Sequence, residues 1–226
     1  MSSKRGAALQ QTVVLYAKQA RQEVKDAVEL YRGLPATGIR HITPRHEQGA
    51  GFMADGYARV TGKPGVCFLI TGPGVTNAAT AMGQAYSDSI PMLVISAVNN
   101  TQDLAMGMGR LHELPDQRNV TAGYTVFSHT LLNPRDLAEV LARAFASFSG
   151  ERPGPVHIEI PVNVITQEVK FIHDDAVICP KPSPDYEVIQ QAARELAAAK
   201  NPVILFGGGI AIAKAFVTSG LSQELG

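Results

Sequence analysis

The sequence predicts an α/β fold in which a parallel sheet is flanked by helices and is followed by the start of a second α/β domain. Two continuous apolar runs, 66–71 and 92–98, are typical of parallel strands that are buried on both faces. The segment between them, 75–86, has the composition of a helix. Strands that alternate with helices in this way indicate βαβ units. An apolar content of 45% in 226 residues is enough to bury such a core.

The other elements follow from local composition. Residues 7–32 contain many helix formers and neither glycine nor proline, which predicts one long helix. The segment 39–43 is short, partly β-branched and bounded by Gly38 and Pro44, which predicts a strand. The predicted helices are 7–32, 47–60, 75–86, 134–148 and 186–199, and the predicted strands are 39–43, 66–71, 92–98, 156–160 and 202–206. We expect a sheet of about six parallel strands.

Composition and charge exclude several classes of protein. Lys plus Arg and Asp plus Glu both total 20, so the formal net charge is zero and nothing indicates a nucleic-acid partner. No apolar run is long enough to span a bilayer, so we expect no membrane partner. Cys67 and Cys179 have neither CxxC nor metal-ligand spacing, which predicts no metal site. The polar N-terminal stretch lacks the apolar core of a signal peptide, which favours the cytoplasm.

Segments that follow predicted strands are candidates for a functional site, because sites in open α/β sheets form beyond the carboxyl ends of the strands. The segment 44–48 places Glu47 at a helix start, where the helix dipole alone would favour a carboxylate. The segment 71–77 is a Gly-Pro-Gly turn before a helix, and it either admits a ligand close to the backbone or is a plain tight turn. The segment 98–117 is a long loop, and long loops at such an edge are often functional.

Blocks of sequence in these segments and beyond carry a family resemblance. In chain order, the blocks are 45–62 (RHEQGAGFMADGYARVTG), 71–77 (TGPGVTN), 88–96 (DSIPMLVIS) and 154–161 (GPVHIEIP). Over residues 30–165 the sequence resembles the N-terminal, pyrimidine-binding domain of thiamine diphosphate-dependent enzymes of the acetolactate synthase and 2-oxo acid decarboxylase type. Residues 186–215 resemble the start of the central domain of that family.

The resemblance divides the chain into predicted parts. They are an atypical N-terminal helix at 1–28, a pyrimidine-binding domain at 29–167, a linker at 168–185 and a truncated central domain at 186–226. In the family, a strand and a Gly-Ile-Pro-Gly-type turn come before the segment that matches 29–34. Residues 24–28 (VKDAV) contain neither glycine nor proline, so we expect this first strand to be missing or replaced.

The resemblance also implies the chemistry of thiamine diphosphate. Glu47 would hydrogen-bond the N1′ nitrogen of the aminopyrimidine and activate the cofactor for decarboxylation or carboligation of 2-oxo acids. The residues implied to bind the cofactor are Thr71, Gly72, Pro73, Gly74 and Asn77. Mg²⁺ would be held by motifs that this sequence lacks. The active site would join two chains, so we expect a homodimer or homotetramer and an inactive isolated chain. Whether Gly207-Gly208-Gly209 contributes to an FAD site stays open.

The segment 110–117 differs from the pattern of acetolactate synthases. The Phe-Gln-Glu of those enzymes falls where this chain has Leu-Pro-Asp at 114–116, and the block is more similar to 5-guanidino-2-oxopentanoate decarboxylases. His112, Glu113 and Asp116 are therefore the candidate substrate-binding residues, because paired carboxylates can grip a guanidinium. A solvated charged loop is the alternative.

Two other classes of function are open at this point. The first alternative is that this chain, which lacks the metal motif, is a catalytically inactive truncated fragment that acts only as a binding or dimerisation module. A generic nucleotide-binding α/β domain would bind ADP or NAD in place of thiamine diphosphate, so ligand binding distinguishes it from the family function.

Overall fold

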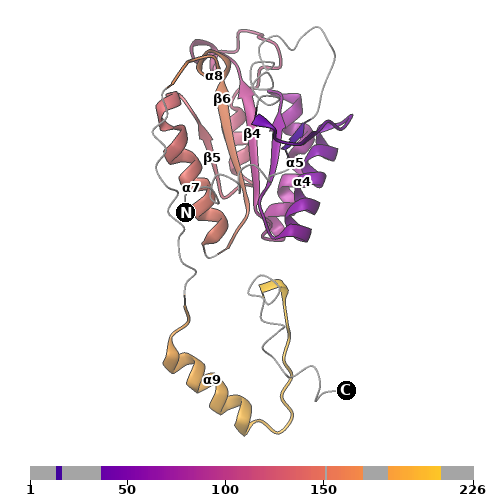
Figure 1. Cartoon of the computed structure of the whole chain (residues 1–226), viewed down its shortest axis with the longest axis vertical. Helices are drawn as coiled ribbons and strands as arrows, with labels where there is room; N and C mark the ends of the chain where they lie inside the picture. Colours follow the sequence, from indigo (N-terminus) through magenta and orange to yellow (C-terminus); the bar gives the residue numbers. More distant parts are fainter. Residues whose placement is uncertain (1–13, 17–36, 151, 170–182, 210–226) are drawn as a thin grey trace. The chain divides into compact units, whose positions relative to one another are not determined.

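The computed structural model describes residues 14–16, 37–150, 152–169 and 183–209 (Figure 1). The chain divides into two units, 1–181 and 182–226, and each is described by itself. The boundary between the units falls inside the predicted linker at 168–185. The first unit contains the sheet and the Gly-Pro-Gly turn at 71–77.

The sheet of the first unit has six strands in the order β2-β1-β3-β4-β6-β5, and every neighbouring pair is parallel. The strands are β1 (Val14–Tyr16), β2 (His41–Ile42), β3 (Gly65–Leu69), β4 (Met92–Val98), β5 (Phe127–Thr130) and β6 (Pro155–Pro161). The order reverses at β1, which pairs with β2 on one side and with β3 on the other. Ligands bind at such a switch point in open α/β sheets, beyond the carboxyl ends of the strands.

Helices cover both faces of the sheet (Figure 1). The helices of the first unit are α4 (Glu47–Thr61), α5 (Pro73–Ser87), α6 (Gln117–Ala122), α7 (Leu137–Ser149) and α8 (Val162–Ile165), with short 3₁₀ turns η1 (Thr101–Asp103) and η2 (Pro134–Asp136). Residues of α4 and α5 form one core cluster with the sheet, and residues of α7 and α8 form another. Successive residues of β4 alternate between these clusters, since Met92 and Val94 join the first and Leu93 the second. The continuous apolar runs are therefore strands buried on both faces, as predicted.

Small residues let α4 lie close to α5 and to the sheet. Ala50 and Ala54 of α4 and Ala78 and Ala81 of α5 are each 0% exposed. Helix α4 begins at Glu47, where the Nδ1 atom of His46 accepts a hydrogen bond from the backbone N–H of Gln48 at 3.2 Å. This close packing fixes Glu47 beside the start of α5.

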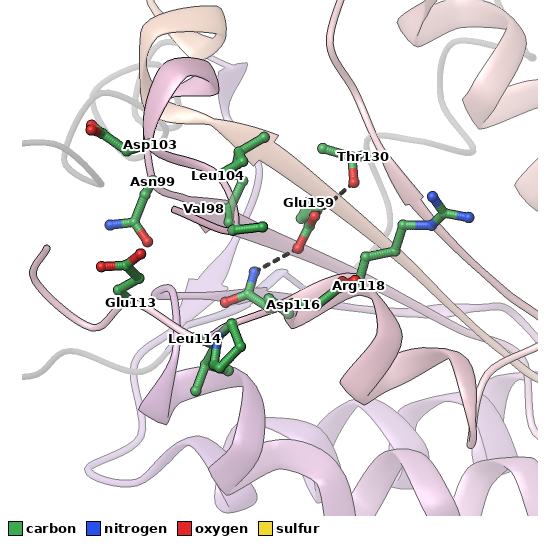
Figure 2. A pocket seen from close by; sticks show the side chains of 13 residues that line it. Val98, Asn99, Asp103, Leu104, Glu113, Leu114, Asp116, Arg118, Thr130 and Glu159 are labelled. Atoms are coloured by element: carbon green, nitrogen blue, oxygen red, sulfur yellow. Dashed lines mark hydrogen bonds between the residues drawn. The ribbon is translucent and has the colours of Figure 1, made fainter. Parts of the chain in front are cut away.

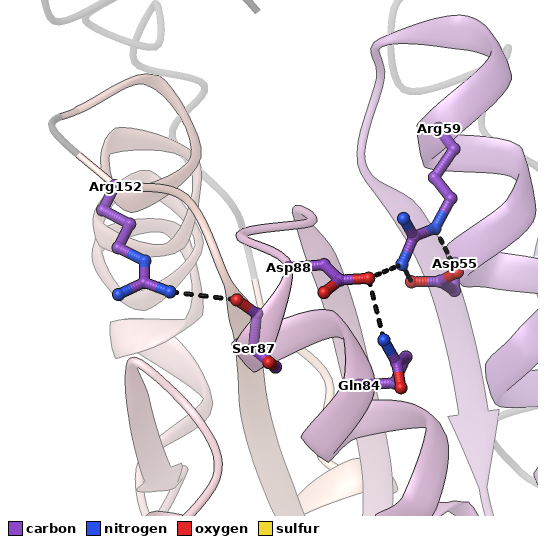
Figure 3. A network of polar contacts seen from close by, with 6 residues as sticks. All are labelled: Asp55, Arg59, Gln84, Ser87, Asp88 and Arg152. Carbon is purple, nitrogen blue, oxygen red and sulfur yellow. Dashed lines mark hydrogen bonds and ion pairs between the residues drawn. The ribbon is translucent and has the colours of Figure 1, made fainter. Parts of the chain in front are cut away.

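A polar network joins the far ends of α4 and α5 (Figure 3). The guanidinium of Arg59 donates to Asp55 at 2.7 Å and to Asp88 at 2.6 Å, and Gln84 donates to Asp88 at 2.8 Å. Hydrogen bonds from Arg59 and then from Gln84 lower the pKa of the Asp88 carboxyl. The network holds together the helix ends that lie away from the carboxyl ends of the strands, so it stabilises the scaffold and is not part of the candidate site.

One prediction about the N-terminal region is wrong. Residues 14–16 lie inside the predicted helix at 7–32, yet they form strand β1. A first strand is therefore present, since Val14 pairs with both His41 and Val66, and of the two alternatives, a missing strand or a replaced one, only the replaced strand is compatible with this pairing. The strand consists of Val14, Leu15 and Tyr16, of which only Val14 is β-branched, and the surrounding helix formers obscure it in the sequence. The rest of 1–36 lies outside the described residues.

Other differences lie at short elements. Strand β5 and helix α6 are absent from the predicted list, since Phe127–Thr130 has only one large apolar residue and α6 has only six residues. In the second unit, helix α9 (Tyr186–Ala198) begins after Asp185, whose carboxylate accepts from the backbone N–H of Glu187 at 2.7 Å. Residues 202–206 have no regular secondary structure, so the strand predicted there is wrong.

Candidate functional site

The candidate site lies at the switch point of the sheet. The connection after β2 leads to Glu47, and the connection after β3 leads to Gly72. Because β2 and β3 are the two neighbours of β1 and all run parallel, these connections leave the same edge of the sheet. The residues implied to bind the cofactor are thus brought together.

Glu47 is the central residue of this site. It is the first residue of α4 and is 2% exposed. Its Oε2 atom accepts a hydrogen bond from Nδ2 of Asn77 on α5 at 3.0 Å. Its Oε1 atom is buried and has no hydrogen-bond partner among the described residues. A buried carboxylate oxygen without a partner is costly, so this atom is placed to take a donor from a ligand.

The turn between β3 and α5 has a backbone conformation that requires glycine. Gly72 has φ 61° and caps α5, and a Cβ atom there would lie 2.1 Å from the backbone oxygen of His112. Pro73 is the exposed first residue of α5. A Cβ atom on Gly74 would lie 2.5 Å from Cγ2 of Ile70 and 3.7 Å from Cγ of Glu47. Glycine thus keeps the space beside the Glu47 side chain open.

These features fit the pyrimidine half of thiamine diphosphate. The open oxygen of Glu47 matches a ring nitrogen that carries or shares a proton, and the glycine turn admits a flat ring close to the backbone. Thr71 and Gly72 lie at this turn, and both donate hydrogen bonds to the side-chain oxygen of Gln117, at 3.0 and 2.7 Å.

A pocket of about 190 Å³ opens beside the carboxyl ends of β4 and β6 (Figure 2). Its lining residues are Val98, Asn99, Asp103, Leu104, Ala105, Glu113, Leu114, Pro115, Asp116, Gln117, Arg118, Thr130 and Glu159. The lining includes Glu113 and Asp116 of the predicted substrate-binding set and omits His112, whose backbone oxygen lies against the turn instead. Glu47 does not line this pocket. Glu47 therefore defines the candidate cofactor site, and the pocket is a separate space at the same end of the sheet.

Both predicted substrate carboxylates also make local contacts. Glu113 accepts from the backbone N–H groups of Arg110 at 2.8 Å and Met108 at 3.2 Å, and the bond from Arg110 is the main reason that its pKa is lowered. Asp116 caps α6 by accepting from the backbone N–H of Asn119 at 2.9 Å. These bonds shape the loop and hold both carboxylates at the pocket wall.

A buried polar network behind the pocket was not predicted from the sequence. Nε2 of His157 lies 2.8 Å from Oγ of Ser96, and its Nδ1 lies 2.8 Å from Thr121 Oγ1 and 2.9 Å from Ser128 Oγ. Glu159, two residues along β6, accepts from Thr130 at 2.7 Å, a bond drawn in Figure 2. The available signal is the alternation of His and Glu with apolar residues in VHIEI, which places both polar side chains on one face of a buried strand.

Burial of His157 predicts a specific dependence of stability on pH. Desolvation lowers the pKa of His157 from 6.5 to about 3, so the folded protein keeps this ring neutral while the unfolded chain protonates it. The stability is fully present above the unfolded pKa of 6.5 and is lost as pH falls toward 3, at up to about 1.4 kcal/mol per pH unit. Urea denaturation of the chain between pH 7 and pH 4 would measure this slope.

The variant His157→Gln isolates the histidine contribution. Desolvation raises the pKa of nearby Glu159, which has the opposite effect on the pH dependence, but this group is present in both proteins. The free energy of unfolding of the variant should therefore fall less steeply with acid than that of the wild type. Equal slopes in the two proteins would contradict a neutral buried His157.

Metal and membrane features of the described chain are few. The described residues contain no group of His, Cys, Asp and Glu that could hold a metal ion. None of the described helices is long and apolar enough to cross a bilayer. Cys67 is a free, buried thiol, and burial strongly raises its pKa.

Comparison with known proteins finds similar chains among thiamine pyrophosphate enzymes, including a decarboxylase and an acetolactate synthase. Residues 23–120 match the family model described as thiamine pyrophosphate enzyme, N-terminal TPP binding domain. Over 202 residues the chain is 56% identical to the probable 2-ketoarginine decarboxylase AruI of Pseudomonas aeruginosa, covering 88% of this chain and 36% of that protein. Over 179 residues it is 38% identical to the acetolactate synthase large subunit of Corynebacterium glutamicum, covering 77% of this chain and 28% of that protein.

A solved structure supports the fold. The chain matches the benzoylformate decarboxylase of Polynucleobacter necessarius with a TM-score of 0.80 and 20% identity, over 93% of this chain and 38% of that one. The predicted α/β fold with a parallel sheet is thereby confirmed. The chain spans about a third of the length of the relatives that it matches, 36% of the first and 28% of the second. The domain that contains Glu47 belongs to the thiamine pyrophosphate enzyme family, as its N-terminal TPP-binding domain.

Proposed function

We propose that this chain supplies the pyrimidine-binding half-site of an enzyme that decarboxylates or ligates 2-oxo acids with thiamine diphosphate. The observation that carries the proposal is the buried Oε1 atom of Glu47, which has no partner among the described residues. Asn77 holds the other oxygen, so the carboxylate has one fixed and one open acceptor. The match to the family model supports the identity of the ligand.

Each residue of the site has a defined part in this proposal. Glu47 accepts or shares a proton at the pyrimidine ring, and Asn77 fixes the orientation of its carboxylate. The turn at Thr71, Gly72, Pro73 and Gly74 presents backbone groups and an open surface to the ring. When bound, the cofactor supplies an electron sink for cleavage or formation of the carbon–carbon bond next to the oxo group. The protein contributes the position of the ring and a carboxylate that accepts or shares its proton.

The substrate side of the proposal rests on the pocket. Glu113, Asp116 and Glu159 place carboxylates in its lining. A guanidinium offers several N–H donors in one plane, which suits recognition by more than one carboxylate. The relative from Pseudomonas aeruginosa is named for 2-ketoarginine, an oxo acid with a guanidino group. We therefore propose a guanidino-substituted 2-oxo acid as the substrate.

Further features of the complete enzyme belong to the same proposal. Mg²⁺ would be held by the additional length that the relatives possess, since the described residues offer no metal cluster. The half-site would be completed by the diphosphate-binding part of a second chain, which makes a homodimer or homotetramer the expected assembly. The cytoplasm is the proposed location.

The proposal is tested with a chimera in which this chain replaces the matching 202-residue region of the Pseudomonas aeruginosa relative. Calorimetry would measure thiamine diphosphate binding in the presence of Mg²⁺, and release of CO₂ would report decarboxylation of 2-oxo acids. The intact relative serves as the reference protein. Binding and turnover by the chimera support the half-site. A folded chimera that binds no cofactor, beside a reference that does, would show that this chain is a non-catalytic module.

The pocket carboxylates give a prediction about substrate selection. In the chimera, Glu113→Gln should lower the preference for guanidino over plain aliphatic 2-oxo acids by about tenfold, the expected loss from one charge-assisted hydrogen bond. Glutamine retains one oxygen, which can still accept from the backbone N–H of Arg110, so the shorter of the two local bonds is kept and only the bond from Met108 is lost. Ratios of kcat/KM for paired substrates measure the effect. Glu139→Gln, in the first turn of α7, is the control, and an unchanged preference at both positions would reject the role of Glu113.

A further inference from the structure

One buried amide connects the cofactor turn to the substrate pocket. Gln117 is the first residue of α6 and is 3% exposed. Its Oε1 atom accepts from the backbone N–H of Gly72 at 2.7 Å and from the hydroxyl of Thr71 at 3.0 Å. Its Nε2 atom donates to the backbone oxygen of Ala97 at 3.1 Å and to Oε2 of Glu159 at 3.0 Å. Gln117 therefore contacts the turn that follows β3 and, at the same time, both β4 and β6.

The orientation of this amide is fixed by its partners. The backbone N–H of Gly72 can only donate, so the atom facing it must be the amide oxygen. The backbone oxygen of Ala97 can only accept, so the atom facing it must be the amide nitrogen. A flip of the amide would break both bonds at a buried position, where unpaired polar groups cost about 1–3 kcal/mol each.

The side chain of Gln117 is not needed to form its own helix. The N-cap of α6 is Asp116, which accepts from the backbone N–H of Asn119 at 2.9 Å. The amide of Gln117 points away from that cap, toward Gly72 on one side and Glu159 on the other. Its bonds are thus directed at the residues of the proposed site.

We infer that Gln117 is a positioning residue that holds the Thr71–Gly72 turn in the geometry required for cofactor binding and ties it to the pocket wall at Glu159. The inference rests on the proposed function, because the turn is assigned to the cofactor there. Gln117 also lines the pocket, so its loss should affect both cofactor and substrate. It acts through Thr71 and Gly72, which are the groups placed against the pyrimidine.

Exchange of the amide hydrogen of Gly72 tests the structural half of this inference in the 226-residue chain. In Gln117→Leu the backbone N–H of Gly72 loses its acceptor, so its exchange should accelerate about tenfold. Gln117→Asn keeps the amide but shortens its reach, and it should change in the same direction. Thr121→Val is the matched control, because Thr121 is 0% exposed and bonds to His157 on the other side of the network.

Cofactor binding by the chimera tests the functional half. Both Gln117 variants should raise the Kd for thiamine diphosphate about tenfold, while Thr121→Val should change it by less than about twofold. Unchanged exchange and unchanged Kd in both Gln117 variants, or equal changes in Thr121→Val, would overturn the inference. If the wild-type chimera itself binds no cofactor, the proposed function fails, and the exchange of Gly72 still decides whether Gln117 holds the turn.

Discussion

Replacement of Glu47 by glutamine should lower kcat of the chimera by about 10²–10⁴-fold, the range typical for loss of a group that transfers protons. The side chain keeps its size, and the amide oxygen can still accept from Asn77, so the fold is retained. The atom at the open position becomes an amide NH₂, which cannot take a proton from the ring or share one with it. Steady-state CO₂ release and calorimetric cofactor titration measure the effect.

The same chemical change elsewhere on α4 provides the control. Asp55 is the other buried carboxylate of this helix, but it pairs with Arg59 at the far end, away from the site. Asp55→Asn should leave kcat within about threefold of wild type while weakening that ion pair, because its effect is confined to stability. A Glu47→Gln enzyme that retains a kcat similar to that of Asp55→Asn would remove Glu47 from the mechanism.

The residues of the proposed site can be singled out in the sequence because they lie in contiguous blocks. Glu47 and the turn at Thr71–Asn77 each follow a strand of the sheet, and parallel strands bring such connections to one edge. These sequence segments do not by themselves predict the contact between Glu47 and Asn77, because that contact depends on the close approach of α4 and α5. The small residues of α4 are consistent with close packing against α5, but they do not specify which residues come into contact.

Gln117 and His157 could not be assigned from the sequence for a different reason. Each makes its hydrogen bonds to residues far away in the chain, such as Gly72 for Gln117 and Ser96 for His157. Local composition describes neither partner. Strand β1 shows the same limit, because its three residues form a strand only through pairing with β2 and β3, against the helix propensity of their surroundings.

The turn itself predicts the largest effect on stability. Gly72→Ala should lower the free energy of unfolding by about 2–5 kcal/mol, because a left-handed backbone costs about 1–2 kcal/mol for a residue with a Cβ and overpacking costs about 1–3 kcal/mol. The added atom would lie 2.1 Å from the backbone oxygen of His112, which cannot move without displacing the loop that leads to Gln117. Urea denaturation gives the stability, and calorimetry gives the accompanying loss of cofactor affinity in the chimera.

Gly83→Ala, a substitution inside the helix that Gly72 caps, should have the opposite effect on the free energy of unfolding. Gly83 lies in the middle of α5, and a Cβ atom there would meet nothing within 4 Å. Alanine at such a position should raise the free energy of unfolding by about 0.4–1 kcal/mol, since it reduces the freedom of the unfolded chain. Opposite signs for the same substitution at the N-cap and in the middle of α5 would show that the cost at position 72 comes from the turn. If Gly72→Ala were as stable as Gly83→Ala, the backbone of His112 would not be held against the turn.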